Sequence, residues 1–336
     1  MYLSKNKKSG IWYVYYRNEE RKKTRLSTRT TFKNEALNFL KDFDKEKKKI
    51  SNVNFTLNEF TIKYLGVSRI THTDNSQRMA KSILEKFKEF VGSDVLLKNI
   101  NKNMAESFIL STYQRAKYNA ALQLRHLKAA FNRAIEWGFI EKNPFKGIKL
   151  RIPENNPTFI TKEELNTIVA NEKDLMLKNI YLWAFHTGMR LSEIMNLEWS
   201  DLDLTQNIIR VRNKESFTTK SKRERIIPIG KVVLEILNGI KENPEYMNSN
   251  YIFNKAGERL GLVWVSKKFK KCVRLANLSE SIHFHTLRHS FASHLVQRGT
   301  SLYILQKLLG HSQISITQKY SHLNQESMNQ AILMLD

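Results

Sequence analysis

HFHTLRHSFASHLVQRGTSLYILQKLLGHSQISITQKYSHL, residues 283–323, is the stretch around which the rest of the chain is organised. Apolar residues at helical spacing run through it and join three groups of reactive side chains. These are two histidines bracketing an arginine, a Leu-Gly-His turn, and a tyrosine nine residues after that last histidine: His285, Arg288, His289, His311 and Tyr320. Imidazole, guanidinium and phenol groups together suit chemistry on a phosphodiester. The alternative is ordinary helix packing beside a basic surface.

The chain is strongly basic, with a formal net charge of +24 over 336 residues. A surplus of this size indicates a polyanionic partner, either nucleic acid or an anionic membrane surface. Residues 1–50 carry 15 Lys or Arg against 6 Asp or Glu, and residues 51–150 carry 16 against 8. Membrane-surface proteins concentrate such charge in one amphipathic segment. Charge spread along the chain therefore favours a double-stranded DNA partner that the protein wraps.

The sequence shows no signal for membrane insertion or secretion. No apolar run approaches the roughly 18 residues of a spanning helix, and MYLSKNKKSG lacks the apolar core of a signal peptide. Cys272 is the only cysteine, which excludes an intramolecular disulfide and a cysteine-based metal site. We therefore expect a cytoplasmic protein with no membrane contact.

The fold class that we predict is mainly α with small β-sheets, in three domains. Residues 1–50 form the first, with β-structure over 10–32 and a helix over 34–49. Four basic residues lie on or beside its second strand: Lys22, Lys23, Arg25 and Arg29. A small sheet with a basic face can enter a DNA groove. A solvated edge strand guarded by lysines explains the same pattern equally well.

The second predicted domain, residues 55–150, shows only helical patterns. Thr56 and Glu59 have the spacing of a capping box, and further helices are expected over 77–91, 103–111 and 117–138. The polar faces of the second and fourth helices carry basic residues: Arg78, Lys81, Arg125 and Lys128. We interpret this module as a basic four-helix domain that contacts DNA, although a solvated helix face accounts for any one of these charges.

The third predicted domain, residues 157–336, follows a Pro-containing linker over 149–157. It mixes helices with short strands over 208–211 and 225–229, which flank the basic segment KESFTTKSKRE. A second capping box is expected at Thr161 and Glu164, and helices are expected over 177–187, 189–197, 231–239 and 265–276. Residues 323–336 form an amphipathic tail helix whose apolar face includes Met328, Ile332 and Leu333.

Two arginines, Arg190 and Arg288, favour a phosphate-binding site. Arg190 lies two residues after Gly188 at a predicted helix start, and helix N-termini and the arginine fork both favour phosphate oxygens. Glu193, three residues later, is placed to hold Arg190, although a purely structural ion pair fits as well. Arg288 supplies a second guanidinium, and two such groups neutralise a pentavalent phosphorane without a metal ion. We expect neither a metal nor another cofactor.

Tyr320 is the candidate nucleophile. A phenol has a pKa near 10, so its attack needs a base or dense positive charge nearby. His285 is the candidate base, and Lys220, at the tip of the predicted hairpin, is the candidate acid for the leaving oxygen. A core tyrosine and a surface lysine are the alternatives for these two residues.

The whole set resembles the active site of the tyrosine recombinase, or phage integrase, family. The resemblance rests on TGMRLSEIMNLEWSDLD around Arg190, on TTKSKRERIIPI with Lys220 eight residues before Pro228, and on HTLRHSFASHL, LGHS and ITQKYSHL further on. It covers residues 157–336 closely. Residues 55–150 resemble the core-binding domain of the family and residues 1–50 resemble its arm-binding domain, the latter loosely.

The resemblance implies a role for each site residue. Tyr320 attacks the scissile phosphate and forms a 3′-phosphotyrosyl link, Arg190 and Arg288 hold the nonbridging oxygens, and His285 acts as base. His311 donates a hydrogen bond to the phosphate. Lys220 acts as acid toward the 5′-oxygen, although Lys214 and Lys222 lie close enough to compete for that role. The covalent link conserves the phosphoester energy, so ATP and metal are not implied.

The resemblance also implies partners: double-stranded DNA recombination sites, a homotetramer in the synaptic complex with the tail helix docking on a neighbour or on its own domain, and accessory DNA-bending or directionality proteins. The extra N-terminal unit favours a mobile-element integrase over Xer-type dimer resolution. Other readings are a catalytically silent DNA-binding regulator of the same fold, a type IB topoisomerase-like enzyme and an RNA-binding protein. The complete set of six residues opposes the first, the separate basic modules oppose the second, and the lack of an RNA-binding motif opposes the third.

Overall fold

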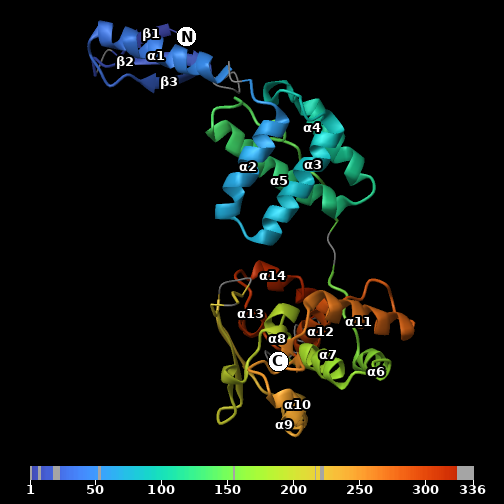
Figure 1. Cartoon of the computed structure of the whole chain (residues 1–336). Coiled ribbons are helices and arrows are strands. Elements are labelled where there is room, and N and C mark those ends of the chain that lie inside the picture. Colours follow the sequence, from blue (N-terminus) through green and yellow to red (C-terminus); the bar gives the residue numbers. More distant parts are fainter. Residues whose placement is uncertain are drawn as a thin grey trace, which may run out of the picture. The chain divides into compact units, whose positions relative to one another are not determined.

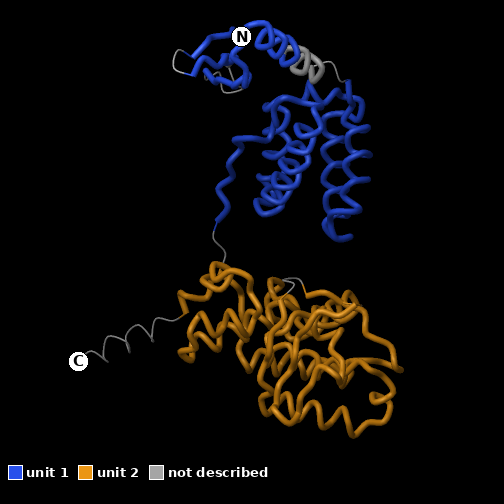
Figure 2. Tube along the Cα trace, turned by 90° about the vertical axis from the view of Figure 1, so that its left-hand side faces the viewer, with its two compact units in different colours: residues 1–153 blue, residues 154–336 orange. Residues whose placement is uncertain are grey.

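The computed structural model describes residues 2–6, 9–17, 23–51, 54–153, 156–215, 217–219 and 223–323. The chain forms two compact units, residues 1–153 and 154–336, coloured separately in Figure 2. Helices dominate both units and the sheets are small and antiparallel, which confirms the predicted fold class. The boundary between the units lies within residues 149–157. The division of the first unit into two separate domains stays a prediction.

The first unit begins with a three-stranded antiparallel sheet in the order β1-β2-β3, shown at the N-terminus in Figure 1. The strands are β1 (Tyr2–Lys5), β2 (Trp12–Arg17) and β3 (Lys23–Ser27), and α1 (Lys33–Ser51) packs against β1 and β2. Val14 and Ala36 are fully buried between sheet and helix. The first strand was not predicted, because YLSK is too short to show a period.

Helices α2 (Leu57–Thr71), α3 (Asp74–Val91), α4 (Lys102–Tyr113) and α5 (Lys117–Glu136) follow, with a short 3₁₀ turn η1 (Leu97–Asn99). The capping box at Thr56 and Glu59 is confirmed. Phenylalanine rings fill the centre, and Phe87 lies 5.1 Å from Phe108 and 5.3 Å from Phe145, centroid to centroid. Such edge-to-face packing stabilises a helical core beyond its buried area.

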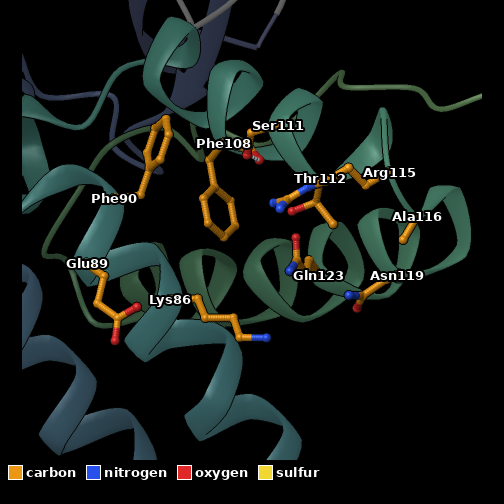
Figure 3. A pocket seen from close by; sticks show the side chains of 10 residues that line it. All are labelled: Lys86, Glu89, Phe90, Phe108, Ser111, Thr112, Arg115, Ala116, Asn119 and Gln123. Carbon is orange, nitrogen blue, oxygen red and sulfur yellow. Dashed lines mark hydrogen bonds between the residues drawn. The ribbon is translucent and has the colours of Figure 1, made fainter.

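A pocket of about 560 Å³ opens between α3, α4 and α5 (Figure 3). Phe90 of α3 lies at its rim and is 48% exposed. Gln123 of α5 points into the pocket, and its buried Oε1 has no hydrogen-bond partner among the described residues. A buried amide oxygen without a partner costs folding free energy, so the packing of this module is imperfect here.

The helices of the second unit are α6 (Lys162–Ala170), α7 (Leu175–Thr187), α8 (Leu191–Met195), α9 (Lys231–Lys241), α10 (Pro244–Met247), α11 (Leu262–Leu275), α12 (Phe284–Gln297), α13 (Leu302–Leu309) and α14 (Ser315–Gln318). The strands are β4 (Leu202–Asp203), β5 (Ile208–Val211) and β6 (Arg225–Pro228) in one antiparallel sheet, and β7 (Asn254–Lys255) and β8 (Glu258–Arg259) in another. Two 3₁₀ turns complete the unit, η2 (Trp199–Asp201) and η3 (Ser321–Leu323).

Helix α7 lies at the centre of this unit, in contact with α6, α8, α9 and α12 (Figure 1). It is apolar on nearly every side, as a fully surrounded helix must be, and Ile180, Tyr181 and Trp183 are fully buried. The predicted capping box at Thr161 and Glu164 and the predicted strands β5 and β6 are confirmed. No helix among the described residues is long and apolar enough to cross a membrane. The predicted tail helix, residues 323–336, falls almost wholly beyond the described residues.

Candidate active site

The site begins at the turn between α7 and α8. The observed helix α8 is shorter than the helix predicted over 189–197. It begins later because Gly188 ends α7 in the left-handed conformation (φ 63°) and Arg190, the residue before α8, is extended. A Cβ atom on Gly188 would lie 2.4 Å from Cδ1 of Phe291, so only glycine fits this turn. The turn presents the Arg190 side chain beside the start of α8.

Glu193 holds Arg190 in place, as predicted from their spacing. Arg190 Nη1 donates to Glu193 Oε1 at 2.8 Å, and the Arg190 backbone N–H donates to Oε2 at 2.8 Å. The Glu193 side chain is 1% exposed, whereas that of Arg190 is 17% exposed. The carboxylate is thus an internal anchor, and part of the guanidinium remains open to solvent.

Arg225 is a second partner of Glu193, and this contact was not predicted from the sequence. Arg225 Nη2 donates to Glu193 Oε2 at 2.6 Å and Nη1 donates to Oε1 at 3.1 Å, while Nε donates to the Leu308 carbonyl at 2.8 Å. Burial raises the pKa of Glu193, but the hydrogen bonds and charge of Arg225 outweigh this effect and lower the pKa to about 2. The carboxylate therefore stays ionised between the two arginines.

Arg288 joins the ends of two helices. It lies on α12 and is 3% exposed; Nη1 donates to the Gly188 carbonyl at 2.7 Å and Nη2 donates to the Leu309 carbonyl at 2.6 Å. Both carbonyls belong to helix C-termini, where unpaired carbonyls carry partial negative charge. Burial and the charge of Arg190 lower the pKa of Arg288. A phosphate anion next to both arginines relieves this cost.

His311 follows Gly310, the left-handed residue (φ 65°) that ends α13. Its Nδ1 lies 2.9 Å from Thr317 Oγ1, which fixes the ring. Burial and the charge of Arg288 lower the pKa of His311 to about 3. The imidazole is therefore neutral near pH 7. When Nδ1 accepts from the Thr317 hydroxyl, the one N–H of the ring is on Nε2 and can be donated to a ligand.

Tyr320 is buried, with 1% of its surface exposed, in a small cluster with residues of α12 and α13. Its hydroxyl lies 2.6 Å from Nδ1 of His289. Burial raises the pKa of Tyr320 to about 12, although the charge of Arg288 acts in the opposite direction. Burial and the nearby His285, Lys319 and Arg288 lower the pKa of His289 to about 3. The imidazole and the phenol are thus both neutral, and in the tautomer with the ring proton on Nε2 the His289 Nδ1 accepts the hydrogen bond that the phenol donates.

One cavity of about 510 Å³ gathers these groups. Five of the six predicted site residues line it: Arg190, His285, Arg288, His311 and Tyr320. The sixth, Lys220, lies outside the described residues, as does Lys222. The third hairpin lysine, Lys214, donates to Asp201 Oδ2 at 2.5 Å and to the Asn196 carbonyl at 3.0 Å, so its ammonium is held by the protein.

His289 was not among the six residues to which the resemblance gave a role, although a signal was present. His285 and His289 are four residues apart on α12, so both rings lie on one face of the helix. Their ring centroids are 4.8 Å apart, with the planes nearly perpendicular at 87°. Arg225 gave no comparable signal, because its contact with Glu193 spans 32 residues.

The basic residues predicted to contact DNA in the first unit have different surroundings. Lys23, Arg25 and Arg29 are exposed on or after β3, and the Arg25 guanidinium lies 5.2 Å from the Tyr13 ring centroid. Lys22 lies outside the described residues. This arrangement leaves the side chains of one strand accessible to a polyanion.

The predicted DNA contacts on the helices divide into two kinds. Arg78 and Lys81 on α3 and Arg125 on α5 are exposed. Lys128 is half-buried, and its Nζ donates to the Ile148 carbonyl at 2.9 Å. Lys128 therefore connects α5 to the segment that follows it, a structural contact that its place on a polar helix face did not reveal.

Comparisons with known proteins cover both units. The sequence matches the Phage integrase SAM-like domain over residues 56–152 and the Phage integrase family over residues 158–327. Tyrosine recombinase XerC of Thermodesulfovibrio yellowstonii is 32% identical over 225 residues, which are 62% of this chain and 73% of that protein. A tyrosine recombinase of Thermosipho africanus is 27% identical over 277 residues, 79% of this chain and 94% of that protein.

Solved structures show the same fold. The Tn1549 transposon integrase in complex with a circular intermediate DNA superposes with a TM-score of 0.71 at 21% identity, over 84% of this chain and 99% of that one. The lambda integrase dimer bound to a COC′ core site superposes with a TM-score of 0.70 at 20% identity, over 95% of this chain and 93% of that one. Matched in sequence over both units and in fold over nearly its full length, the chain belongs to the phage integrase family, the tyrosine recombinases.

Proposed function

We propose that this tyrosine recombinase is the integrase of a mobile element, which cuts and rejoins double-stranded DNA through Tyr320. The observation that carries the chemistry is one cavity of about 510 Å³ that is lined by the Tyr320 phenol, two guanidiniums and three imidazoles. A phosphodiester in this cavity has Arg190 and Arg288 for its nonbridging oxygens and the His311 N–H as a further donor. Attack by Tyr320 then yields a 3′-phosphotyrosyl link and a 5′-hydroxyl.

The remaining parts of the proposal come from the family resemblance. Lys220 protonates the leaving 5′-oxygen. The enzyme assembles as a homotetramer on two DNA sites, with the predicted tail helix docking on a neighbouring protomer or on its own domain, and accessory DNA-bending or directionality proteins set the outcome. The lambda integrase structure that contains a tetramer bound to a Holliday junction supports this assembly by its fold, at 20% identity and a TM-score of 0.69.

The N-terminal sheet favours a mobile-element integrase over Xer-type resolution. The superposition on lambda integrase covers 95% of this chain, so it includes most of residues 1–50. The curated relatives named XerC favour the second candidate function, resolution of chromosome or plasmid dimers, but the Thermodesulfovibrio protein aligns with only 62% of the chain. An enzyme that binds a second type of DNA site needs an additional DNA-contacting unit, and the N-terminal sheet is suited to that role.

Covalent trapping tests the chemistry. DNA duplexes selected from a random library by binding to the protein provide the site, and a nick placed beside the cleavage position prevents rejoining. Wild type is expected to leave a protein–DNA adduct on a denaturing gel, with a 5′-hydroxyl on the released strand, and Tyr320→Phe to leave none. An adduct that persists in Tyr320→Phe, or no adduct from wild type, would sink the proposal.

The same selection separates the two candidate functions. An integrase with an arm-binding sheet is expected to select two unrelated DNA motifs, and an Xer-type enzyme to select one. The variant Lys23→Ala/Arg25→Ala/Arg29→Ala should lose one motif and keep the other, together with adduct formation. A single motif, selected equally by wild type and variant, contradicts the integrase assignment and favours dimer resolution.

A further inference from the structure

The hydroxyl of Tyr320 has a hydrogen-bond partner on α12, the Nδ1 atom of His289. The phenol oxygen and His289 Nδ1 are 2.6 Å apart, which is hydrogen-bond distance. His289 itself is held from the other side, because the His285 ring lies perpendicular to it with centroids 4.8 Å apart. The nucleophile and this nitrogen are therefore in direct contact.

We propose that His289 is the base that takes the proton of Tyr320 during DNA cleavage, a role that the family resemblance gives to His285. The inference rests on the proposed function, since it concerns the same reaction. His289 qualifies as a catalytic residue because it contacts the reacting oxygen. His285, one helical turn earlier, then serves to position the His289 ring and to contact the DNA phosphate in the shared cavity.

The proton and electron balance of the step is complete. The Tyr320 Oη–phosphorus bond forms as the bond from phosphorus to the 5′-oxygen breaks, and the tyrosyl proton moves along the existing hydrogen bond to His289 Nδ1. The leaving 5′-oxygen takes its proton from the acid, Lys220 in the proposed mechanism. Rejoining reverses each transfer: the 5′-hydroxyl attacks phosphorus, and His289 returns its proton to the phenol.

The charges around His289 connect proton transfer to the presence of DNA. Burial and the neighbouring His285, Lys319 and Arg288 lower the pKa of His289 and keep its ring neutral near pH 7. In the tautomer with the proton on Nε2, the Nδ1 lone pair is available to the phenol. A phosphodiester between Arg190 and Arg288 brings negative charge to the cavity, which stabilises an imidazolium. His289 thus becomes a stronger base when the substrate is bound, and a weak one when the site is empty.

Chemical rescue tests this role in the full-length protein. Single-turnover cleavage of the nicked duplex is followed for wild type, His289→Ala, His289→Gln and His285→Ala, each with and without free imidazole. His289→Ala is expected to be slower than wild type by roughly 10²–10⁴-fold, the usual contribution of a general base. Imidazole, which fits the space left by the side chain beside the cavity, should restore part of the rate of this variant only.

His289→Gln covers the case in which the alanine variant folds poorly. Its side-chain amide can still accept a hydrogen bond from Tyr320 but cannot accept a proton. It should bind DNA like wild type and cleave as slowly as His289→Ala. Wild-type cleavage by His289→Gln, or imidazole rescue of His285→Ala in its place, would overturn the assignment. Wild-type adduct formation in the same experiment shows that the proposed function stands even if this inference fails.

Discussion

Glu193 shows how single residues set the electrostatics of this site. Its buried carboxylate binds Arg190 on one side and Arg225 on the other. With these two partners the ionised carboxylate stabilises the folded protein. Removal of one partner leaves a buried charge that is not compensated. The arginine that we propose binds the scissile phosphate is therefore oriented by a carboxylate that lies inside the protein.

The acid stability of the protein should depend on this carboxylate. The pKa of Glu193 falls from 4.5 to about 2 on folding, so its contribution to stability is present above pH 4.5 and is lost as the pH falls toward 2. The contribution is roughly 3 kcal/mol at 1.36 kcal/mol per pKa unit. The free energy of unfolding, measured by denaturant titration of wild type and Glu193→Gln from pH 7 to pH 2, should fall less steeply for the variant below pH 4.5. Parallel curves would contradict this.

Residue types and spacing predicted part of this network and missed the rest. The Arg190–Glu193 pair was predictable, because residues three apart at a helix start are neighbours whatever the tertiary fold. Arg225 was not, since its place depends on β6 passing the end of α13, a long-range contact with no local pattern. His311 was found from its Leu-Gly-His turn, but its partner Thr317 was not. The two residues are only six apart, and their contact depends on the turn between α13 and α14, which shows no helical or strand period.

At the scale of elements, the site is built from helix ends. Arg190 is the residue immediately before α8. The two carbonyls that accept hydrogen bonds from Arg288 lie at the C-terminal ends of α7 and α13, and His311 follows the end of α13. The predicted helices over 177–187 and 231–239 were close to those observed, because the apolar pattern of each continues over several helical turns. The helix predicted over 189–197 was too long, since no apolar period reveals that Arg190 is extended.

The turn at Gly188 should tolerate no side chain. In Gly188→Ala, the methyl group meets Phe291 and the backbone keeps a left-handed φ, which alone costs about 1–2 kcal/mol. We expect a lower midpoint of thermal unfolding and, because the Gly188 carbonyl binds Arg288, slower adduct formation. Gly239→Ala is the matched control: Gly239 lies inside α9 with open space around it, so alanine should stabilise the protein by roughly 0.5–1 kcal/mol. A Gly188→Ala protein as stable and active as wild type would disprove this account of the turn.

For the whole molecule, the net charge of +24 is the dominant property. Exposed basic residues lie on the N-terminal sheet and on α3 and α5, and further arginines lie in the cavity of the second unit. Such a distribution predicts that DNA affinity comes largely from the release of counterions by phosphate contacts.

The salt dependence of DNA binding measures this directly. A protein that neutralises six or more phosphates should give a slope of log affinity against log salt concentration of roughly −5 or steeper. Lys81→Gln should reduce the magnitude of the slope by about 1, as expected for one lost phosphate contact. Lys128→Gln is the control, because that ammonium already binds the Ile148 carbonyl and should leave the slope unchanged. Equal effects of the two substitutions would contradict the division between exposed and structural lysines.

The hydrogen bonds of Arg288 affect how related sequences should be judged. Because this guanidinium closes two helix ends, a relative that has lost all catalytic activity still needs it in order to fold. An arginine at this position is consequently poor evidence that a homologue is an active enzyme. Tyr320 is the better marker, since a phenylalanine can fill the same buried space, leaving a protein that recognises its sites but never breaks a strand.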